Sequence, residues 1–151
     1  MGLEYKIETA KIEDLKEILE LQHLAYITEA KRFNNMNIQP LTETLDELIN
    51  EFNNGLVIKM TIDNKIIGSI RAKEDNNTVY IGKLMVHPDC RNKGYGSMLV
   101  LEIEKHYSNK RFELFTSTRS IENIRMYERL GYKPFKTEKI DSELEFIYLE
   151  K

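Results

Sequence analysis

The chain has 151 residues, of which 41% are hydrophobic and 31% are charged, and this predicts one globular domain over residues 1–151 with a full core. Its formal charge of −3, with the basic residues dispersed along the chain, argues against general binding of nucleic acid. With one cysteine, a charged N-terminus that carries no export signal and no run of roughly 18 apolar residues, we expect a cytoplasmic protein without disulfides, membrane spans or a metal site.

Seven strand patterns and four helix patterns follow one another along the chain, in the order β-α-α-β-β-β-α-β-α-β-β. In the helices the apolar side chains recur every three or four residues, and in the strands they alternate or form short apolar runs. The predicted strands cover residues 5–9, 56–62, 65–73, 78–86, 112–116, 132–137 and 143–149. The predicted helices cover residues 12–30, 42–54, 95–107 and 120–130.

Turn residues mark the ends of several elements. Thr42 is expected to cap the second helix after an Asn-rich loop over residues 32–40. Asp63 and Asn64 suit a two-residue hairpin, and Gly131 stands where a left-handed residue ends the last helix. Because the order combines a hairpin meander with two helical crossovers, we expect an α/β (α+β) fold, with a mixed and mostly antiparallel sheet of about seven strands and helices on both faces.

The most informative stretch covers residues 84–97, where an apolar strand leads through a polar turn into a helix that begins near Tyr95. Gly94 and Gly96 let the backbone turn sharply, and the helix N-terminus adds unpaired N–H groups and a positive dipole end. The stretch therefore predicts an anion site that suits a pyrophosphate. It lacks the lysine of a Walker loop, and it lacks the third glycine and the βαβ setting of a dinucleotide fingerprint.

The same stretch resembles motif A of the GNAT superfamily of N-acetyltransferases, in which Arg/Gln-x-x-Gly-x-Gly/Ala follows an apolar strand that ends in Val-x-Pro. Here the corresponding residues are Val86-His87-Pro88 and Arg91-x-x-Gly94-x-Gly96. A second match consists of Asn123, Tyr127 and Leu130-Gly131-Tyr132, on and just after the last helix. The resemblance covers nearly the whole chain, because the predicted order of elements is that of the GNAT fold.

The resemblance implies a site for acetyl-CoA where two neighbouring parallel strands splay apart, the strand ending at Val86 and the strand over residues 112–116. It implies that Asn123 hydrogen-bonds the pantetheine end and that Tyr127 acts as the general acid beside the sulfur. A homodimer is compatible with the family. The implied acetyl-CoA-binding residues are Leu84, Met85, Val86, Arg91, Asn92, Lys93, Gly94, Tyr95, Gly96, Ser97, Asn123 and Tyr127.

The acceptor is expected to be a small-molecule amine or a peptide amine, bound beside residues 26–41, which border the acceptor side in the family. In this tract the residues suited to a cationic amine are Tyr26, Glu29 and Phe33. Many family members carry a carboxylate on the strand before the glycine loop, where this chain has Gly82 and Lys83. The general base therefore stays open among Glu29, Glu43, Asp46, His87 and a water chain.

These observations predict an acetyl-CoA-dependent N-acetyltransferase in which a primary amine attacks the thioester directly within a ternary complex. Such an enzyme has to hold the amine in line, stabilise the oxyanion through the N–H of Met85 or Val86, and protonate the leaving thiolate. The alternative is a non-catalytic acyl-CoA-binding or protein-interaction module on the same fold. The presence of Tyr127 favours catalysis.

Overall fold

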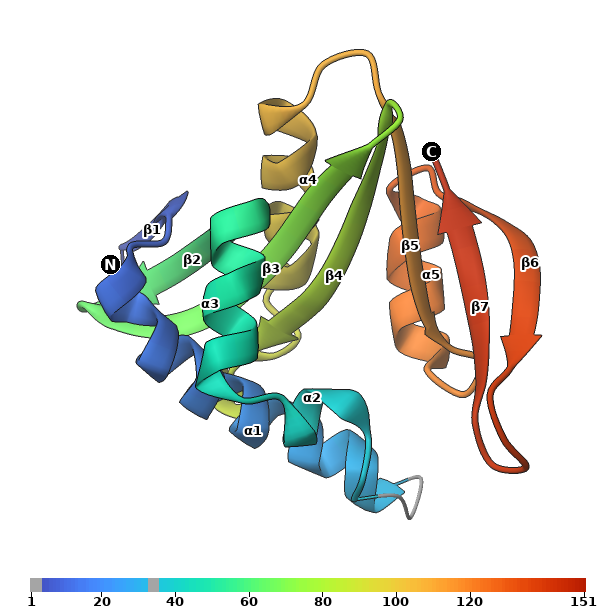
Figure 1. The fold of residues 1–151 in the computed structure, drawn as a ribbon, viewed down its shortest axis with the longest axis horizontal. Coiled ribbons are helices and arrows are strands. Elements are labelled where there is room, and N and C mark those ends of the chain that lie inside the picture. Colours follow the sequence, from blue (N-terminus) through green and yellow to red (C-terminus); the bar gives the residue numbers. More distant parts are fainter. Residues whose placement is uncertain (1–3, 33–35) are drawn as a thin grey trace.

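A computed structural model describes residues 4–32 and 36–151, which fold around a 7-stranded sheet with the strand order β1-β2-β3-β4-β5-β7-β6 (Figure 1). Neighbouring strands pair antiparallel except β4 and β5, which are parallel. The mixed, mostly antiparallel sheet is therefore confirmed. The strands are β1 (Tyr5–Thr9), β2 (Leu56–Ile62), β3 (Lys65–Asp75), β4 (Thr78–Val86), β5 (Arg111–Ser117), β6 (Lys133–Lys139) and β7 (Glu145–Glu150).

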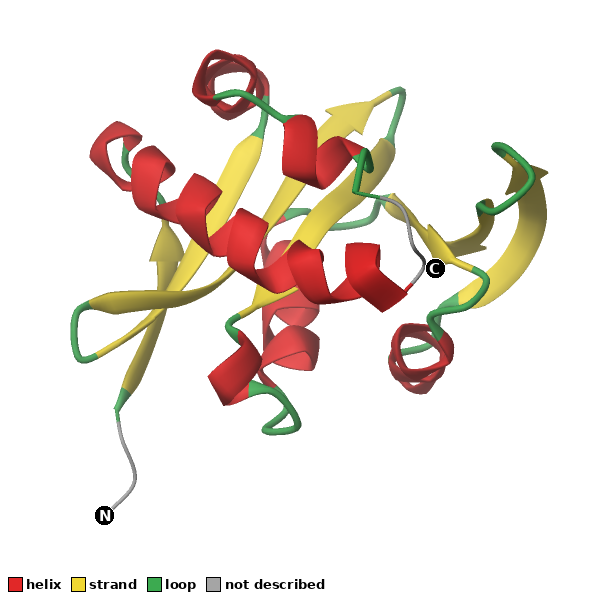
Figure 2. Ribbon diagram, turned by 90° about the horizontal axis from the view of Figure 1, so that it is seen from below, coloured by secondary structure: helices red, strands yellow, loops and turns green. Residues whose placement is uncertain are grey.

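Helices lie on both faces of the sheet, as predicted. Helices α1 and α3 cover one face of its N-terminal half, and α4 and α5 lie on the opposite side (Figures 1 and 2). Within the described residues, no helix combines the length and the apolar character needed to cross a membrane. The helices are α1 (Leu15–Arg32), α2 (Gln39–Thr42), α3 (Leu45–Asn54), α4 (Tyr95–His106) and α5 (Ile121–Arg129), with short 3-10 turns η1 (Ile12–Asp14) and η2 (Pro88–Cys90).

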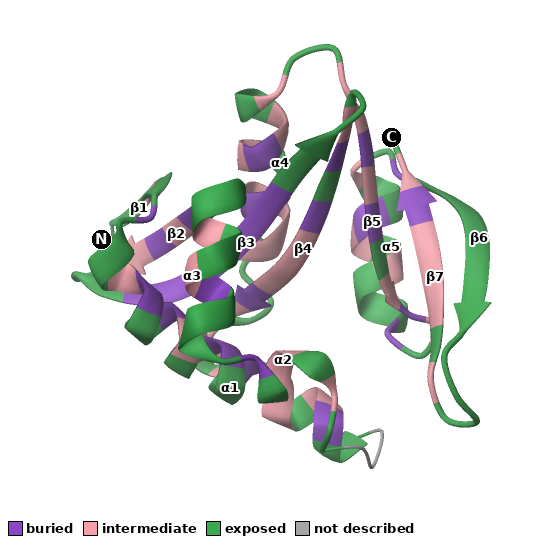
Figure 3. Cartoon of the chain, viewed as in Figure 1, coloured by how far each residue is buried: buried purple, intermediate pink, exposed green. Residues whose placement is uncertain are grey.

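The core consists of two clusters of buried side chains, one on each face of the sheet. Leu15 and Ile18 of α1 pack with Leu48 of α3 on one face, and Leu99 and Ile103 of α4 pack on the other. Each such side chain contributes about 1.5–3 kcal/mol through its removal from water. Figure 3 shows this burial in β2 to β5 and on the inward sides of the helices, whereas β6 is exposed along its length. The clusters fix α1 and α4 against β4, where the candidate site lies.

The start of the second predicted helix is the clearest difference from the sequence prediction. Thr42 ends the separate short helix α2, and the N-cap of α3 is Thr44. The Thr44 hydroxyl accepts a hydrogen bond from the Glu47 N–H at 3.2 Å, and the Glu47 carboxylate accepts one from the Thr44 N–H at 2.8 Å. This reciprocal capping box satisfies two backbone donors, so the prediction for Thr42 was wrong.

The predicted turns are confirmed by their backbone angles. Asp63 and Asn64 have φ angles of 52° and 64° in the hairpin between β2 and β3, and Gly131 has a φ of 99° directly after α5. Asparagine, aspartate and glycine adopt such left-handed conformations at the lowest cost. The residue types at these turns therefore determine where the strands and the last helix end.

The parallel strands β4 and β5 pair along only part of their length. Their pairing runs from Thr78 opposite Arg111 to Tyr80 opposite Glu113. On its other edge β5 pairs with β7 from Glu113 to Ser117, so beyond Glu113 only that edge is paired. Strands β4 and β5 then diverge, as Figure 1 shows, in agreement with the splayed strands that the family resemblance implies.

A β-bulge accompanies this divergence. Along the edge of β4 that pairs with β3, the register between the two strands shifts between Ser69 and Arg71. Lys83 and Leu84 of β4 therefore lie opposite a single residue of β3. Lys83 has a φ of 53°. Bulges bend a strand and redirect its side chains, and this one lies directly before the end of β4 that leads into the glycine loop.

Candidate active site

The turn between β4 and α4 presents a row of unused backbone donors. The first backbone hydrogen bond of α4 runs from the Met98 N–H to the Gly94 carbonyl at 3.2 Å. In the part of the chain that the structure describes, none of the N–H groups of residues 91–97 donates a hydrogen bond. Together with the positive end of the helix dipole, these donors form a site for an anionic group.

The two glycines of this turn have different structural roles. Gly94 is the N-cap of α4 with a φ of 81°, and no atom lies within 4 Å of the position that a Cβ would take. At Gly96, a Cβ would lie 3.2 Å from the Met126 sulfur. Gly94 therefore gives the turn its shape and leaves open space before it, whereas Gly96 allows α4 to pack closely against α5.

Arg91 joins the glycine loop to α1. Its guanidinium donates a hydrogen bond to the carbonyl of Ala25 at 3.0 Å. Asn92 and Lys93 are exposed beside it, and Asn92 has a φ of 63°. The sequence had suggested only a role in binding pyrophosphate for Arg91, and the contact with α1 was not predicted.

The end of β4 is held by a side chain from α1. The Tyr26 hydroxyl donates a hydrogen bond to the Leu84 carbonyl at 2.9 Å. Met85 is buried next to it, and Val86 is half-buried. Tyr26 is also the residue predicted to receive a cationic amine, and its hydroxyl fixes the backbone of β4 beside the bulge.

Tyr127, the predicted general acid, lies in α5 with only 6% of its surface exposed. Its ring contacts that of Tyr132, with 6.2 Å between the centroids. Its hydroxyl makes no hydrogen bond to any other described residue. Burial and then the nearby charge of Glu29 raise the pKa of the Tyr127 phenol, so it keeps its proton at neutral pH.

Helices α1 and α5 meet beside Tyr127. The Ser120 hydroxyl, at the N-cap of α5, donates a hydrogen bond to the Glu29 carboxylate at 2.9 Å. Burial raises the pKa of the Tyr26 phenol, and Tyr127 and Glu29 raise it further. The side chains of Tyr26, Glu29 and Tyr127 are therefore electrostatic neighbours, although they come from two helices on opposite sides of the sheet.

The remaining predicted site residues are Asn123 and Phe33. Asn123 is exposed and lies one helical turn before Tyr127 on α5, so the two share a face of the helix. Phe33, proposed as an acceptor contact, lies outside the described residues.

Most of the side chains considered as the general base already form hydrogen bonds. Glu43 accepts hydrogen bonds from the Arg71 guanidinium at 2.8 and 3.0 Å and from Gln22 at 3.0 Å. Burial alone would raise the pKa of Glu43, but these hydrogen bonds lower it below its usual value, so the group is a poor base. His87 accepts the Asp89 N–H through Nδ1 at 3.1 Å, and Asp46 is exposed in the first turn of α3.

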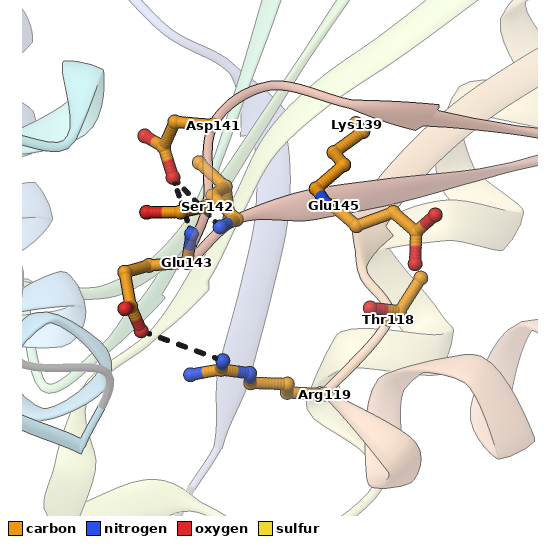
Figure 4. Close-up of a pocket in the computed structure, with 8 residues that line it drawn as sticks. Thr118, Arg119, Lys139, Asp141, Ser142, Glu143 and Glu145 are labelled. Carbon is orange, nitrogen blue, oxygen red and sulfur yellow. Dashed lines mark hydrogen bonds and ion pairs between the residues drawn. The ribbon is translucent and has the colours of Figure 1, made fainter.

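A polar cavity of about 220 Å³ lies between the start of α5 and the β6–β7 hairpin (Figure 4). The Asp141 carboxylate closes the hairpin by accepting the N–H groups of Glu143 and Leu144 at 2.7 and 2.8 Å. Glu143 forms an ion pair with Arg119 at 3.7 Å. Arg119 precedes Ser120 in the chain, so the cavity adjoins the Glu29 side of the site. No group of three or more possible metal ligands was found among the described residues.

The divergent parallel strands and the open N-terminus of α4 form an anion site next to the helix that carries the buried Tyr127. A family model described as the acetyltransferase (GNAT) family matches residues 14–132. This match covers more than half of the chain, and the chain therefore belongs to the GNAT acetyltransferase family. A search of curated protein sequences found no match.

Solved structures share this fold. The ribosomal-protein-S18-alanine N-acetyltransferase of Escherichia coli aligns over 97% of this chain and 92% of its own, with a TM-score of 0.80 and 14% identity. The PaiA N-acetyltransferase of Thermoplasma acidophilum, solved with coenzyme A, aligns over 99% of both chains with a TM-score of 0.80 and 21% identity. The putative acetyltransferase yncA of Salmonella typhimurium, solved with acetyl-CoA, aligns over 97% of this chain and 92% of its own, with a TM-score of 0.75 and 16% identity.

Proposed function

We propose that this protein is an N-acetyltransferase that moves the acetyl group from acetyl-CoA to a primary amine by direct attack within a ternary complex. The observation that carries the proposal is the joint placement of unused N–H groups over residues 91–97, the separation of β4 from β5, and the buried Tyr127. Two proteins of similar fold were solved with coenzyme A and acetyl-CoA, which supports the same ligand here.

The residues of the glycine loop and of β4 suit the two ends of acetyl-CoA. The N–H groups of residues 91–97 would hold the pyrophosphate, because they are unpaired and lie at a helix N-terminus. The backbone at the end of β4 would pair with the pantetheine arm in the manner of an added strand. Asn123 would hydrogen-bond the same arm from α5.

Tyr127 and the end of β4 would carry out the chemistry. The amine nitrogen forms a bond to the acetyl carbon, and the carbonyl oxygen gains negative charge, which the N–H of Met85 or Val86 stabilises. As the carbon–sulfur bond breaks, the Tyr127 hydroxyl gives its proton to the thiolate. The nitrogen releases a proton that restores the phenol. The raised pKa of Tyr127 keeps it in the donor form before each turnover.

The surroundings of the site favour a cationic acceptor, either a small-molecule amine or a peptide amine. Three carboxylates, Asp141, Glu143 and Glu145, line the cavity between α5 and the β6–β7 hairpin, against two basic side chains, Arg119 and Lys139. An excess of negative charge attracts an ammonium group.

A panel of amines tests this function. Polyamines, amino acids and peptides with free N-termini would each be incubated with the protein and acetyl-CoA, and the release of free coenzyme A would be measured. We expect release with at least one class, and a product heavier than the acceptor by one acetyl group. If acetyl-CoA binds and no amine releases coenzyme A, the protein is a binding module and the proposal is wrong.

Gly94→Val tests the anion site. The left-handed backbone costs an L residue roughly 1–2 kcal/mol, so the loop should relax and displace its N–H groups. We expect the dissociation constant for acetyl-CoA to rise about tenfold or more, the equivalent of about 1.4 kcal/mol, measured by calorimetry. Gly131→Val is the matched control: its φ is 99° but it lies after α5, so it should lower stability without weakening binding. Equal effects of the two variants on affinity would contradict the placement of the pyrophosphate.

A further inference from the structure

Lys83 occupies an unusual position for a lysine. It lies in the bulge of β4 with a φ of 53°, a left-handed conformation that is uncommon for residues other than glycine, asparagine and aspartate. Residues held in such conformations gather at functional sites, where the surrounding structure enforces them. Lys83 directly precedes Leu84, whose carbonyl accepts the Tyr26 hydroxyl. The bulge therefore places this lysine at the edge of the candidate active site.

The amine of Lys83 is half-buried and forms no ion pair or hydrogen bond with any other described residue. The charged groups around it are Arg71 of β3, Glu43 in the connection between α2 and α3, and Glu47 and Glu51 of α3. Arg71 and Glu43 neutralise each other through a buried ion pair at 2.8 Å. A half-buried amine with no partner among the described residues is available for a ligand.

Lys83 shares its charged neighbours with Tyr26. Arg71 and Glu43, which act on Lys83, also act on the Tyr26 phenol, and Tyr26 is in turn a neighbour of Tyr127. The amine of Lys83 thus lies on the face of β4 that carries α1 and α3, toward the acceptor-bordering tract between these helices. The four side chains considered as the base are hydrogen-bonded or exposed, as described above.

We propose that Lys83 is the general base that removes a proton from the acceptor ammonium, an inference that rests on the proposed N-acetyltransferase function. The neutral amine of Lys83 takes one proton from the ammonium, which becomes a free amine, while Lys83 becomes an ammonium. The free amine then attacks the acetyl carbon, and Tyr127 protonates the thiolate as described. Lys83 returns its proton to solvent through its exposed side, so each turnover releases one proton.

The electrostatics agree with this role. Burial lowers the pKa of Lys83, Glu43 opposes this shift, and Arg71 adds to it, with a net lowering from the usual value. A lowered pKa increases the fraction of neutral amine near pH 7, which a base requires. A lysine on an exposed strand surface would stay protonated there.

The test compares Lys83→Met and Lys83→Arg with wild type in the pH dependence of kcat/KM for the acceptor at saturating acetyl-CoA. Met removes the amine, and Arg keeps the charge but cannot lose its proton. We expect kcat/KM at pH 7 to fall by about 10²- to 10⁴-fold in both variants. Both should also lose the increase of kcat/KM with pH that the deprotonation of Lys83 causes in the wild type. The loss should shrink for acceptor amines of low pKa, which arrive already neutral. The affinity for acetyl-CoA should stay unchanged.

Lys73→Met on the neighbouring strand β3 is the matched control, because Lys73 is exposed, and it should leave the profile unchanged. Full activity in Lys83→Arg, or an equal loss for acceptors of high and low pKa, would overturn the proposal in favour of a charge or packing role. An NMR titration measures the pKa of the Lys83 side chain without turnover, and the Lys83 signal is identified as the one that is absent from Lys83→Met. An ordinary lysine pKa in the complex with acetyl-CoA would refute the role of Lys83 as general base. Failure of the wild type to acetylate any amine would refute the proposed function.

Discussion

Tyr127→Phe is expected to lower kcat by about 10²- to 10⁴-fold, the range that a positioned general acid contributes, with little change in the affinity for acetyl-CoA. The substitution removes only the hydroxyl, which no other described residue binds, and it keeps the ring that packs against Tyr132. Stability should therefore change little. Single-turnover kinetics and calorimetric binding of acetyl-CoA would separate the chemical step from binding.

Tyr132→Phe is the matched control for this experiment. Tyr132 is also buried, with 1% of its surface exposed, but its hydroxyl donates to the Glu104 carboxylate at 2.9 Å. Removing a hydrogen bond to a charged group costs about 1.5–3 kcal/mol, so this variant should lose stability and keep its kcat. Wild-type turnover in Tyr127→Phe would remove Tyr127 from the mechanism.

Local signals in the sequence were sufficient for most of the fold. Asp63 and Asn64 predicted the β2–β3 turn because few other residues accept a positive φ, and Gly131 predicted the end of α5 for the same reason. Thr42 was predicted as the N-cap although the residue three positions later is Leu45, which cannot complete a capping box. Only Thr44 has a glutamate three residues later, and this pairing decided the helix start.

The candidate site could be predicted only where it follows one continuous stretch. The turn over residues 91–97 shows its glycines directly in the sequence. The contacts of Tyr26 with Leu84 and of Glu29 with Ser120 join residues 58 and 91 positions apart, and no local pattern indicates such pairs. The bulge at Lys83 was missed because a lysine gives no sign of a left-handed conformation, unlike glycine or asparagine.

The buried ion pair of Arg71 and Glu43 could not be predicted from the sequence either. This pair holds the segment that leads into α3 against the sheet. Glu43 accepts from Gln22, and Gln22 also donates to the Pro40 carbonyl at 2.8 Å. The network thus links α1, α2 and β3 directly beside Lys83. Its integrity should govern both stability and the position of the acceptor-bordering tract.

Arg71→Met is expected to lower the free energy of unfolding by about 3–5 kcal/mol, because it leaves the Glu43 carboxylate buried without its partner. Arg71 is 3% exposed and Glu43 is 5% exposed, so water cannot replace the lost contact. The double variant Arg71→Met/Glu43→Met removes both charges and should recover most of the loss. Urea unfolding of the single and double variants would measure the difference, and equal losses in both would instead indicate that packing of the arginine stem matters more than charge.

The loss in Arg71→Met should also depend on pH. In wild type the pKa of Glu43 is lowered, so its ionised form stabilises the fold above the usual glutamate pKa, and this contribution disappears as the pH falls through the folded-state value. In Arg71→Met the carboxyl is buried without a cation, so its pKa should rise and its protonation in acid should relieve the penalty. The unfolding free energies of wild type and Arg71→Met should therefore converge as the pH falls below about 4, the region of the unperturbed glutamate pKa. A constant difference between pH 7 and pH 3 would contradict an ion-pair origin of the loss.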